Sequence, residues 1–423
     1  MNNQTIKLSL FINYFVFGIL LNSVGTVILQ VQNTYGVTES AASVLEAFKD
    51  LSIAITSFLV ASFVVRIGYK KCMLLALAIV TVVSLLMPQI PVFWMTKLMF
   101  AAIGISFALI KVSVFASLGL VTSDSKDHVS WMNFLESFFM VGVLSGFFVF
   151  SQFVDDANPG SMAWLDVYYL IAGLTFFAFL LMLFTRLDES QIHSEGDNPS
   201  LVEDFSEMIQ LSIKPLVLIF IVCAFIYVLI EQSIMSWLPT FNNTILNLPT
   251  SLSIQMASIL AASTALGRFV AALVFQWVDW FKTLTIALVL AAVLVLIVLP
   301  LAGQSSNTVI TGWSDAPLAA FIFPLVGFCL APVYPAINSV ILSSLPVRQH
   351  APMTGLIVVF SALGGTTGSI VTGTLFEFFG GKTAFYFSLL PISLLLFSLY
   401  CLKKKTSHSS NTMNSAGAVG STH

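Results

Sequence analysis

The sequence LDESQIHSEGDNPSLVEDFSEMIQLSI occupies residues 187–213, in the middle of the chain. It carries seven acidic residues, whereas only 9% of the 423 residues of the whole chain are charged and 57% are hydrophobic. Soluble domains contain about 25% charged residues. Composition therefore indicates an integral membrane protein, and this acidic stretch divides it into two halves.

Long apolar runs flank the acidic stretch on both sides. A run of about 20 apolar residues can cross a bilayer as a helix. Six such runs precede the stretch and six follow it: 8–31, 41–65, 70–89, 94–120, 131–154, 164–186, 214–239, 252–277, 282–302, 317–341, 352–377 and 383–402. We therefore predict an all-α membrane protein with twelve transmembrane helices in two six-helix bundles.

This division sets the expected domains. We predict an N-terminal bundle over residues 1–186, an acidic cytoplasmic linker over 187–213, a C-terminal bundle over 214–402 and a disordered cytoplasmic tail over 403–423. Ser200 and Glu203 in the linker fit a capping box that starts a helix. An amphipathic helix at the membrane surface is expected after it, with the apolar stripe Leu201, Val202, Phe205, Met208 and Ile209.

The basic residues predict the orientation. If the N-terminus is cytoplasmic, twelve of the seventeen Lys and Arg residues fall in cytoplasmic segments, as the positive-inside rule requires. We therefore expect a multi-pass protein of the cell (inner) membrane with both termini in the cytoplasm.

Two six-helix halves joined by a polar loop are typical of secondary transporters. The chain has no GxxxxGK[ST] loop, no pattern of metal ligands and no soluble output domain. We expect a monomer in the lipid bilayer that is not an enzyme, binds neither cofactor nor metal nor nucleic acid, and acts on a small-molecule substrate together with protons or another coupling ion.

Seven ionic residues lie well inside the apolar runs, where an ion facing lipid costs at least about 2.5–3.5 kcal/mol. They are Glu46, Lys49, Asp50, Lys111, Glu136, Glu231 and Arg268. Such residues face a bundle interior or a wet cavity, usually with a partner. They either form structural ion pairs or bind substrate and exchange partners as the halves move.

The ionic residues fall into two sets by their depth in the membrane, which follows from the rise of about 1.5 Å per residue in an α-helix. Lys111, Glu136 and Arg268 lie about 13, 8 and 14 Å from the cytoplasmic ends of their helices, so these three are expected to meet. Glu46, Lys49 and Asp50 share one helix face in the outer half, at the depth of Glu231. A carboxylate that alternates between partners changes its proton affinity, which would couple transport to a proton gradient.

The turn VVRIGYKK (64–71) resembles the G-x-x-x-D-R-x-G-R-[RK] signature of the major facilitator superfamily. Arg66, Gly68, Lys70 and Lys71 match in kind, whereas Val65 stands where the family has an acid. The resemblance implies that helices 1, 4, 7 and 10 line a cavity. The candidate cavity residues on helices 1, 7 and 10 are then Asn22, Gln232, Trp237, Tyr334 and Asn338.

Five further segments resemble the fucose–galactose–glucose:proton symporter branch of this superfamily. They are ILQVQNTYGVTESAASVLEAF (28–48), YVLIEQSIMSWLPTF (227–241), GRFVAAL (267–273), GFCLAPVYPAINSVI (327–341) and GGTTGSIVTG (364–373). Two acids of that branch fall on Gly25 and Lys111. A lysine in the cavity suits an anionic substrate better than a neutral sugar, and Glu136 or Glu231 would have to carry the proton.

Three functions remain open from the sequence. The first is proton-coupled uptake of a small polar or anionic metabolite, such as a sugar-like solute, by alternating access. The second is proton-antiport export of a metabolite, siderophore or drug-like compound, which the 38 Phe residues would suit. The third is a membrane receptor that transports nothing. The candidate residues for substrate binding are Asn22, Lys111, Glu231, Gln232, Tyr334 and Asn338. Those for coupling or gating are Lys49, Asp50, Glu136, Arg268, Arg66 and Gly68.

Overall fold

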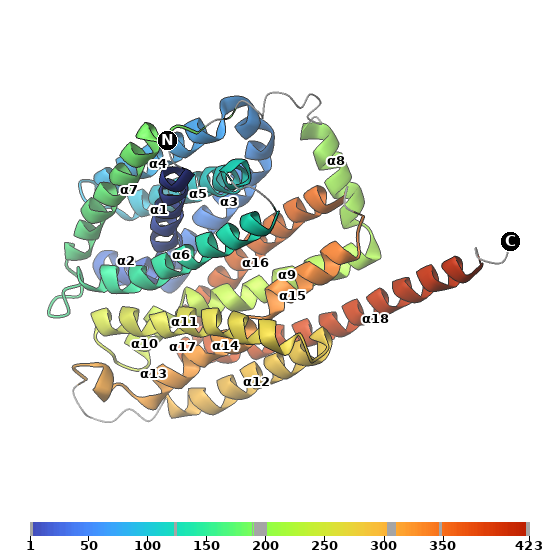
Figure 1. Ribbon diagram of the computed structural model, residues 1–423. Coiled ribbons are helices and arrows are strands. Elements are labelled where there is room, and N and C mark those ends of the chain that lie inside the picture. The colour runs from blue at the N-terminus through green and yellow to red at the C-terminus, as the bar shows by residue number, and fades with distance from the viewer. Residues whose placement is uncertain are drawn as a thin grey trace.

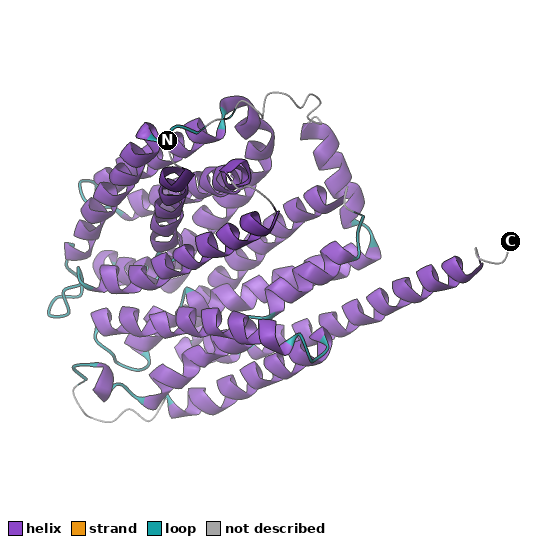
Figure 2. Cartoon of the chain, in the orientation of Figure 1, coloured by secondary structure: helices purple, strands orange, loops and turns teal. Residues whose placement is uncertain are grey.

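The computed structural model describes residues 3–121, 125–187, 189, 201–302, 310–346 and 349–419. These residues form helices joined by loops, and none of them is in a strand (Figures 1 and 2). The helices before the central stretch are α1 (Asn3–Leu21), α2 (Val24–Tyr35), α3 (Glu39–Ile67), α4 (Tyr69–Leu86), α5 (Phe93–Val121), α6 (Ser125–Ser151) and α7 (Val167–Phe184). Those within and after it are α8 (Leu201–Ser212), α9 (Pro215–Met235), α10 (Leu238–Thr244), α11 (Thr250–Val274), α12 (Trp280–Leu301), α13 (Leu318–Ile322), α14 (Val326–Leu330), α15 (Val333–Ser343), α16 (His350–Phe379), α17 (Gly381–Tyr386) and α18 (Leu389–Val419).

The membrane-spanning architecture predicted from the apolar runs is confirmed. In the described part of the chain, ten helical segments are long and apolar enough to cross a membrane, and the bent pair of α1 and α2 makes eleven. Helix α3, with 29 residues, is long enough to be the twelfth.

Several spans are broken, among them the first and the tenth, which are broken for different reasons. The first bends by 41° between α1 and α2, where the Asn22 amide donates to the Gly18 carbonyl and the Ser23 hydroxyl donates to the Leu20 carbonyl. Side chains that bond to the backbone in this way compete with the helix ladder. The tenth span is divided into α13, α14 and α15 at Pro324 and Pro332, because proline has no N–H to donate.

The helices of each half pack mainly against one another. Helix α1 lies against α5, α6 and α7, and α9 lies against α16 and α18. Contacts between the halves pair α3 with α16, α6 with α11, and α2 with α10. We call the end of the bundle that carries Thr34, Ser151, Ser251 and Glu377 the junction end. The opposite end, which carries Gly68, α8 and Asp279, is called the linker end.

The central linker and the tail differ in part from expectation. An amphipathic helix does form as α8, but Met208 and Leu211 on it are buried, and Met208 packs against Gly355 of α16, so part of its apolar side covers protein. Residues 188 and 190–200, including Ser200, lie outside the described residues. Helix α18 continues to Val419 through the segment expected to be disordered, because neither Gly nor Pro occurs between Pro391 and Gly417 to end it.

Candidate functional site

One group of polar residues lies in the first half, on α1, α5 and α6. The Tyr14 hydroxyl donates to Glu136 Oε1 at 3.3 Å. The ammonium of Lys111 is close enough to Glu136 to interact electrostatically, although no ion pair within 4 Å joins these two described residues. Lys111 Nζ also lies 5.8 and 6.0 Å from the ring centres of Phe107 and Phe115. A cation, a carboxylate and a phenol therefore lie close together beside the rings of Phe107 and Phe115.

A second group lies in the other half, on α9, α11, α15 and α16. The Tyr227 hydroxyl donates to Glu231 at 2.8 Å, and the Tyr227 ring stacks on Tyr334 with 5.5 Å between their centres. The Tyr334 hydroxyl lies 2.9 Å from Ser361 Oγ. Arg268 and Glu231 both act electrostatically on Tyr227. This group again combines a cation, a carboxylate and phenols.

The two groups lie at matching depths. Helices α6 and α11 hydrogen-bond at the junction end, where Gln255 donates to Ser151. Glu136 is then about 22 Å from that contact along α6, and Arg268 about 20 Å along α11. Lys111, Glu136 and Arg268 are all exposed although they lie within spanning helices. No direct bond between the two groups is found in the described residues, so the structure brings Lys111 and Glu136 together and leaves Arg268 in the other half.

The ionic residues of α3 have a different environment. Lys49 pairs with Glu46 and, at 3.4 Å, with Asp50. Glu46 is fully buried, and Lys49 and Asp50 are 5% and 8% exposed. Ser236 of the other half donates to Glu46 Oε2 at 2.8 Å. The sequence placed Glu231 at this depth, but Glu231 bonds to Tyr227 and the partner across the halves is Ser236.

Further hydrogen bonds close the junction end. The Ser40 amide donates to Glu377 at 3.1 Å, and the Ser251 amide donates to Asp156 at 2.8 Å. Gly25 of α2 lies so close to α9 that a Cβ there would stand 2.8 Å from the Ser236 carbonyl oxygen. A side chain larger than that of glycine has no room at this position.

Two candidate cavity residues have mainly local partners. The Asn22 amide is occupied by its own helix, and Gln232 accepts a hydrogen bond from Ser236 at 3.4 Å. Asn338 leaves its buried side-chain oxygen without a partner while its side chain bonds to Tyr334. Trp237 is fully buried and donates to the Ser369 carbonyl at 3.1 Å, so it lies neither in an interfacial belt nor on a cavity wall.

The turn between α3 and α4 holds an acid from the linker. Gly68 adopts a φ of +96°, which favours glycine, and the Glu189 carboxylate lies where a Cβ of Gly68 would stand. Glu189 also accepts the Lys70 amide at 2.7 Å, at the N-terminus of α4. A linker acid thus occupies this turn, although Val65 replaces the acid of the signature. The side chain of Arg66 is outside the described residues.

Sequence reasoning missed Tyr14, Tyr227, Ser236 and Ser361. Tyr227 is four residues before Glu231, and residues at this spacing lie on the same helix face. The sequence alone could therefore have identified it. Tyr14, Ser236 and Ser361 meet their partners only through contacts between different helices, and nothing in the sequence marks them.

Comparison with known proteins identifies relatives of the fold. The family model of the Major Facilitator Superfamily matches residues 10–323. The nucleoside transporter NupG is 15% identical, with a TM-score of 0.73 over 96% of this chain and 100% of that chain. A bacterial homolog of the human lysosomal transporter Spinster is 14% identical, with a TM-score of 0.73 over 97% of both chains.

The E. coli fucose:proton symporter FucP gives a TM-score of 0.60 at 15% identity, over 95% of this chain and 99% of that chain. No curated protein matches the sequence. At these identities the structural likeness shows the fold, and the resemblance to the fucose symporter branch is one among several.

Proposed function

Since this chain belongs to the major facilitator superfamily, and is therefore a secondary transporter and not an enzyme, we propose that it carries a small polar or anionic metabolite by proton-coupled uptake. The observation that carries this proposal is the pair of ionic and phenolic groups around Lys111 and around Glu231. Each contains both signs of charge, and the exposed members lie at matching depths on helices of opposite halves.

Lys111 is the residue that points to an anionic substrate. Lys111 is exposed and its ammonium lies beside two aromatic rings, so it is accessible to a carboxylate of the substrate. Glu136 lies next to it and is hydrogen-bonded to Tyr14. In this proposal the substrate anion pairs with Lys111, and Glu136 gives up or takes the coupling proton when that pairing changes, because a nearby cation favours the ionised carboxylate.

The buried triad of Glu46, Lys49 and Asp50 is the proposed gate. Together with Ser236 it joins the two halves in the part of the bundle nearer the junction end, and the halves must separate there for substrate to pass. The segments predicted to be cytoplasmic carry twelve of the seventeen basic residues, and the turn between α3 and α4 at the linker end is one of them. We therefore propose that the linker end is cytoplasmic and the junction end faces outward.

A screen by thermal unfolding tests the substrate class. Purified protein is heated with sugars, carboxylates and siderophores, since a ligand that binds the folded form raises its stability by about 2.7 kcal/mol at a hundred times its Kd. We expect a carboxylate to stabilise the wild type and to lose this effect in Lys111→Gln. The control is Lys97→Gln, on the same helix near the junction end. Equal stabilisation of the wild type and Lys111→Gln by neutral sugars alone would contradict the anionic substrate.

A pH electrode distinguishes the direction of coupling. In right-side-out vesicles, uptake with protons makes the outside more alkaline when the stabilising ligand is added. Proton-antiport export of an amphiphilic compound is the second candidate, favoured by the rings of Phe107, Phe115 and Phe139 around Tyr14. That alternative predicts proton movement opposite to the flow of the ligand.

A further inference from the structure

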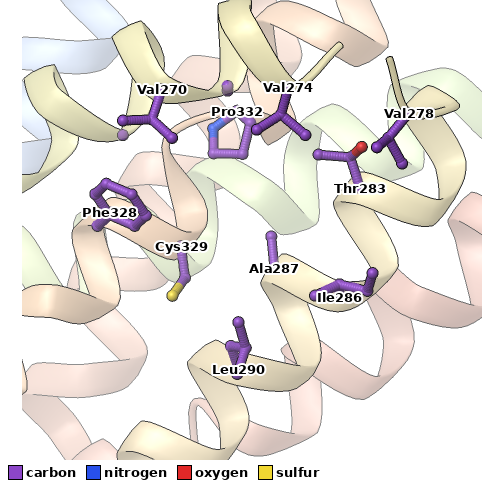
Figure 3. A pocket seen from close by; sticks show the side chains of 12 residues that line it. Val270, Val274, Val278, Thr283, Ile286, Ala287, Leu290, Phe328, Cys329 and Pro332 are labelled. Carbon is purple, nitrogen blue, oxygen red and sulfur yellow. The ribbon is translucent and has the colours of Figure 1, made fainter.

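A cleft of about 230 Å³ lies between α11, α12 and the junction of α14 with α15 (Figure 3). Its walls are apolar apart from Thr283, and the other lining residues include Val278, Ala287, Phe328 and Cys329. An apolar cavity of about 150 Å³ already holds benzene. The cleft therefore has room for a segment of a hydrocarbon chain, but it has no set of polar groups to bind a polar substrate.

The cleft opens on the outside of the bundle. Three of its lining residues, Val278, Ile286 and Leu290, are exposed. The same helices carry other large exposed apolar side chains beside it, including Phe269 at 65% and Ile297 at 57%. In a membrane protein such a surface faces lipid, so acyl chains of the bilayer are the molecules that reach the cleft.

Basic and aromatic side chains lie at the linker end of the cleft. Lys282 is exposed and is four residues before Ile286, so both share one face of α12. Trp277, next to the lining residue Val278, is 80% exposed, as expected of an aromatic side chain at the level of the headgroups. Lys403 of α18 lies 3.9 Å from Asp279 in the same turn. Two further exposed lysines, at 404 and 405, give this level an excess of positive charge.

We propose that this cleft binds an acyl chain of an anionic phospholipid, with its phosphate held near Lys282. The distance along α12 from Lys282 to Leu290 is about 12 Å, which fits the upper part of an acyl chain below its headgroup. Pro332, at the break of the tenth span, lines the cleft, and Tyr334 follows two residues later. A bound chain therefore contacts the helix break that positions Tyr334. The lipid site itself does not depend on the proposed transport activity.

Native mass spectrometry and thermal unfolding of the full-length chain in detergent test the proposal. Phosphatidylglycerol and phosphatidylcholine with identical acyl chains are added separately. We expect the wild type to retain phosphatidylglycerol and to be stabilised more by it than by phosphatidylcholine. Ala287→Trp fills the cleft and should weaken retention of phosphatidylglycerol by about tenfold, and Lys282→Gln should remove the preference between the two lipids.

Matched variants keep the test decisive. Val289→Trp places the same side chain on an exposed position of α12 outside the cleft and should leave retention unchanged, as should Lys97→Gln. If Ala287→Trp fails to fold, Ile286→Trp at the rim replaces it. The lipid site would be overturned if a folded cleft-filling variant retained as much phosphatidylglycerol as the wild type. A further outcome would also overturn it: the wild type forms dimers without bound lipid, and the cleft variants abolish these dimers. A second copy of the chain would then be the occupant of the cleft.

Discussion

Lys49, in the half of the bundle nearer the junction end, and Lys111, in the half nearer the linker end, are both lysines within apolar helices, yet their surroundings are opposite. Lys49 is 5% exposed and lies between two carboxylates. Lys111 is exposed and, among the described residues, has no carboxylate within 4 Å. The same sequence signal, a charge in an apolar run, thus produces a sealed contact between halves in one place and an accessible group in the other. Burial of the charge and completeness of its pairing separate a structural ion from one that is free to meet a substrate.

Replacing Lys49 should have the largest effect on stability. Lys49→Met leaves Glu46 and Asp50 buried without their cation, and breaking a buried ion pair costs about 3–5 kcal/mol. Thermal unfolding in detergent measures this loss. The triple variant Glu46→Gln, Lys49→Met, Asp50→Asn should regain most of it, because neutral replacement removes the unpaired charges. A single variant as stable as the wild type would show that the triad is not sealed.

Gly25→Val tests the tightness of the junction end. A Cβ at this position would meet the backbone oxygens of Met235 and Ser236 at 3.0 and 2.8 Å, and overpacking of this kind costs about 1–3 kcal/mol. Gly173→Val is the matched control, since nothing lies within 4 Å of its Cβ position. Unfolding temperatures should fall for the first variant only. An equal fall in both would remove the evidence for close contact between α2 and α9.

Lys111→Gln and Glu136→Gln should impair transport but leave the unfolding temperature nearly unchanged, in contrast to Lys49→Met. We expect each to reduce the uptake rate by about tenfold to a hundredfold, which corresponds to about 1.4–2.8 kcal/mol. The charge-swapped double variant, Lys111→Glu with Glu136→Lys, should recover part of the rate. Full activity in both single variants, measured with the ligand found by thermal unfolding, would remove both residues from the site.

Tyr227→Phe should have a smaller effect on transport. It removes one hydrogen bond to Glu231, worth about 1 kcal/mol, and keeps the ring that stacks on Tyr334. The expected change is about fivefold in the uptake rate. Tyr14→Phe is the matched variant of the first half and should give a change of similar size. A large effect in one half only would show that the two groups are not equivalent.

The smallest effect concerns Asp315, in the loop before α13. Hydrogen bonds from the Thr311 hydroxyl and amide lower the pKa of Asp315. A carboxylate with a lowered pKa in the folded state adds stability above its ordinary pKa and loses it as the pH falls through the folded value. Thr311→Val should therefore lose less stability than the wild type when the pH falls. Unfolding temperatures at neutral and acidic pH measure it, and identical pH profiles would contradict the assignment.

The apolar runs of the sequence predicted much of the fold. Their lengths and the acidic stretch at 187–213 predict the spanning helices, and the spacing of Glu46, Lys49 and Asp50 correctly places them on one face of α3. The bend after Leu21 was not predicted, because no proline marks it and the cause is side-chain bonding by Asn22 and Ser23. Helix α8 was predicted, but its burial against Gly355 was not, since a hydrophobic stripe does not indicate whether lipid or protein covers it.

The sequence predicted only part of the candidate site. The sequence identified Lys111, Glu136, Glu231 and Arg268 because ions in apolar runs are costly, but it grouped Arg268 with the first two from depth alone. Depth gives the position of a residue along the membrane normal, but it does not say which helices lie beside that residue. Partners such as Tyr14 and Ser361 are ordinary residues whose roles depend on which helices lie beside them.

The sequence by itself determined that the chain crosses the membrane many times and that its few intramembrane charges require shelter from lipid, because hydrophobic length and the cost of burying a charge are local properties. Only the tertiary structure decided which charges are sealed and which are exposed. That choice depends on contacts between helices far apart in the chain, where Ser236 bonds to Glu46 and Gly25 lies against the backbone of α9.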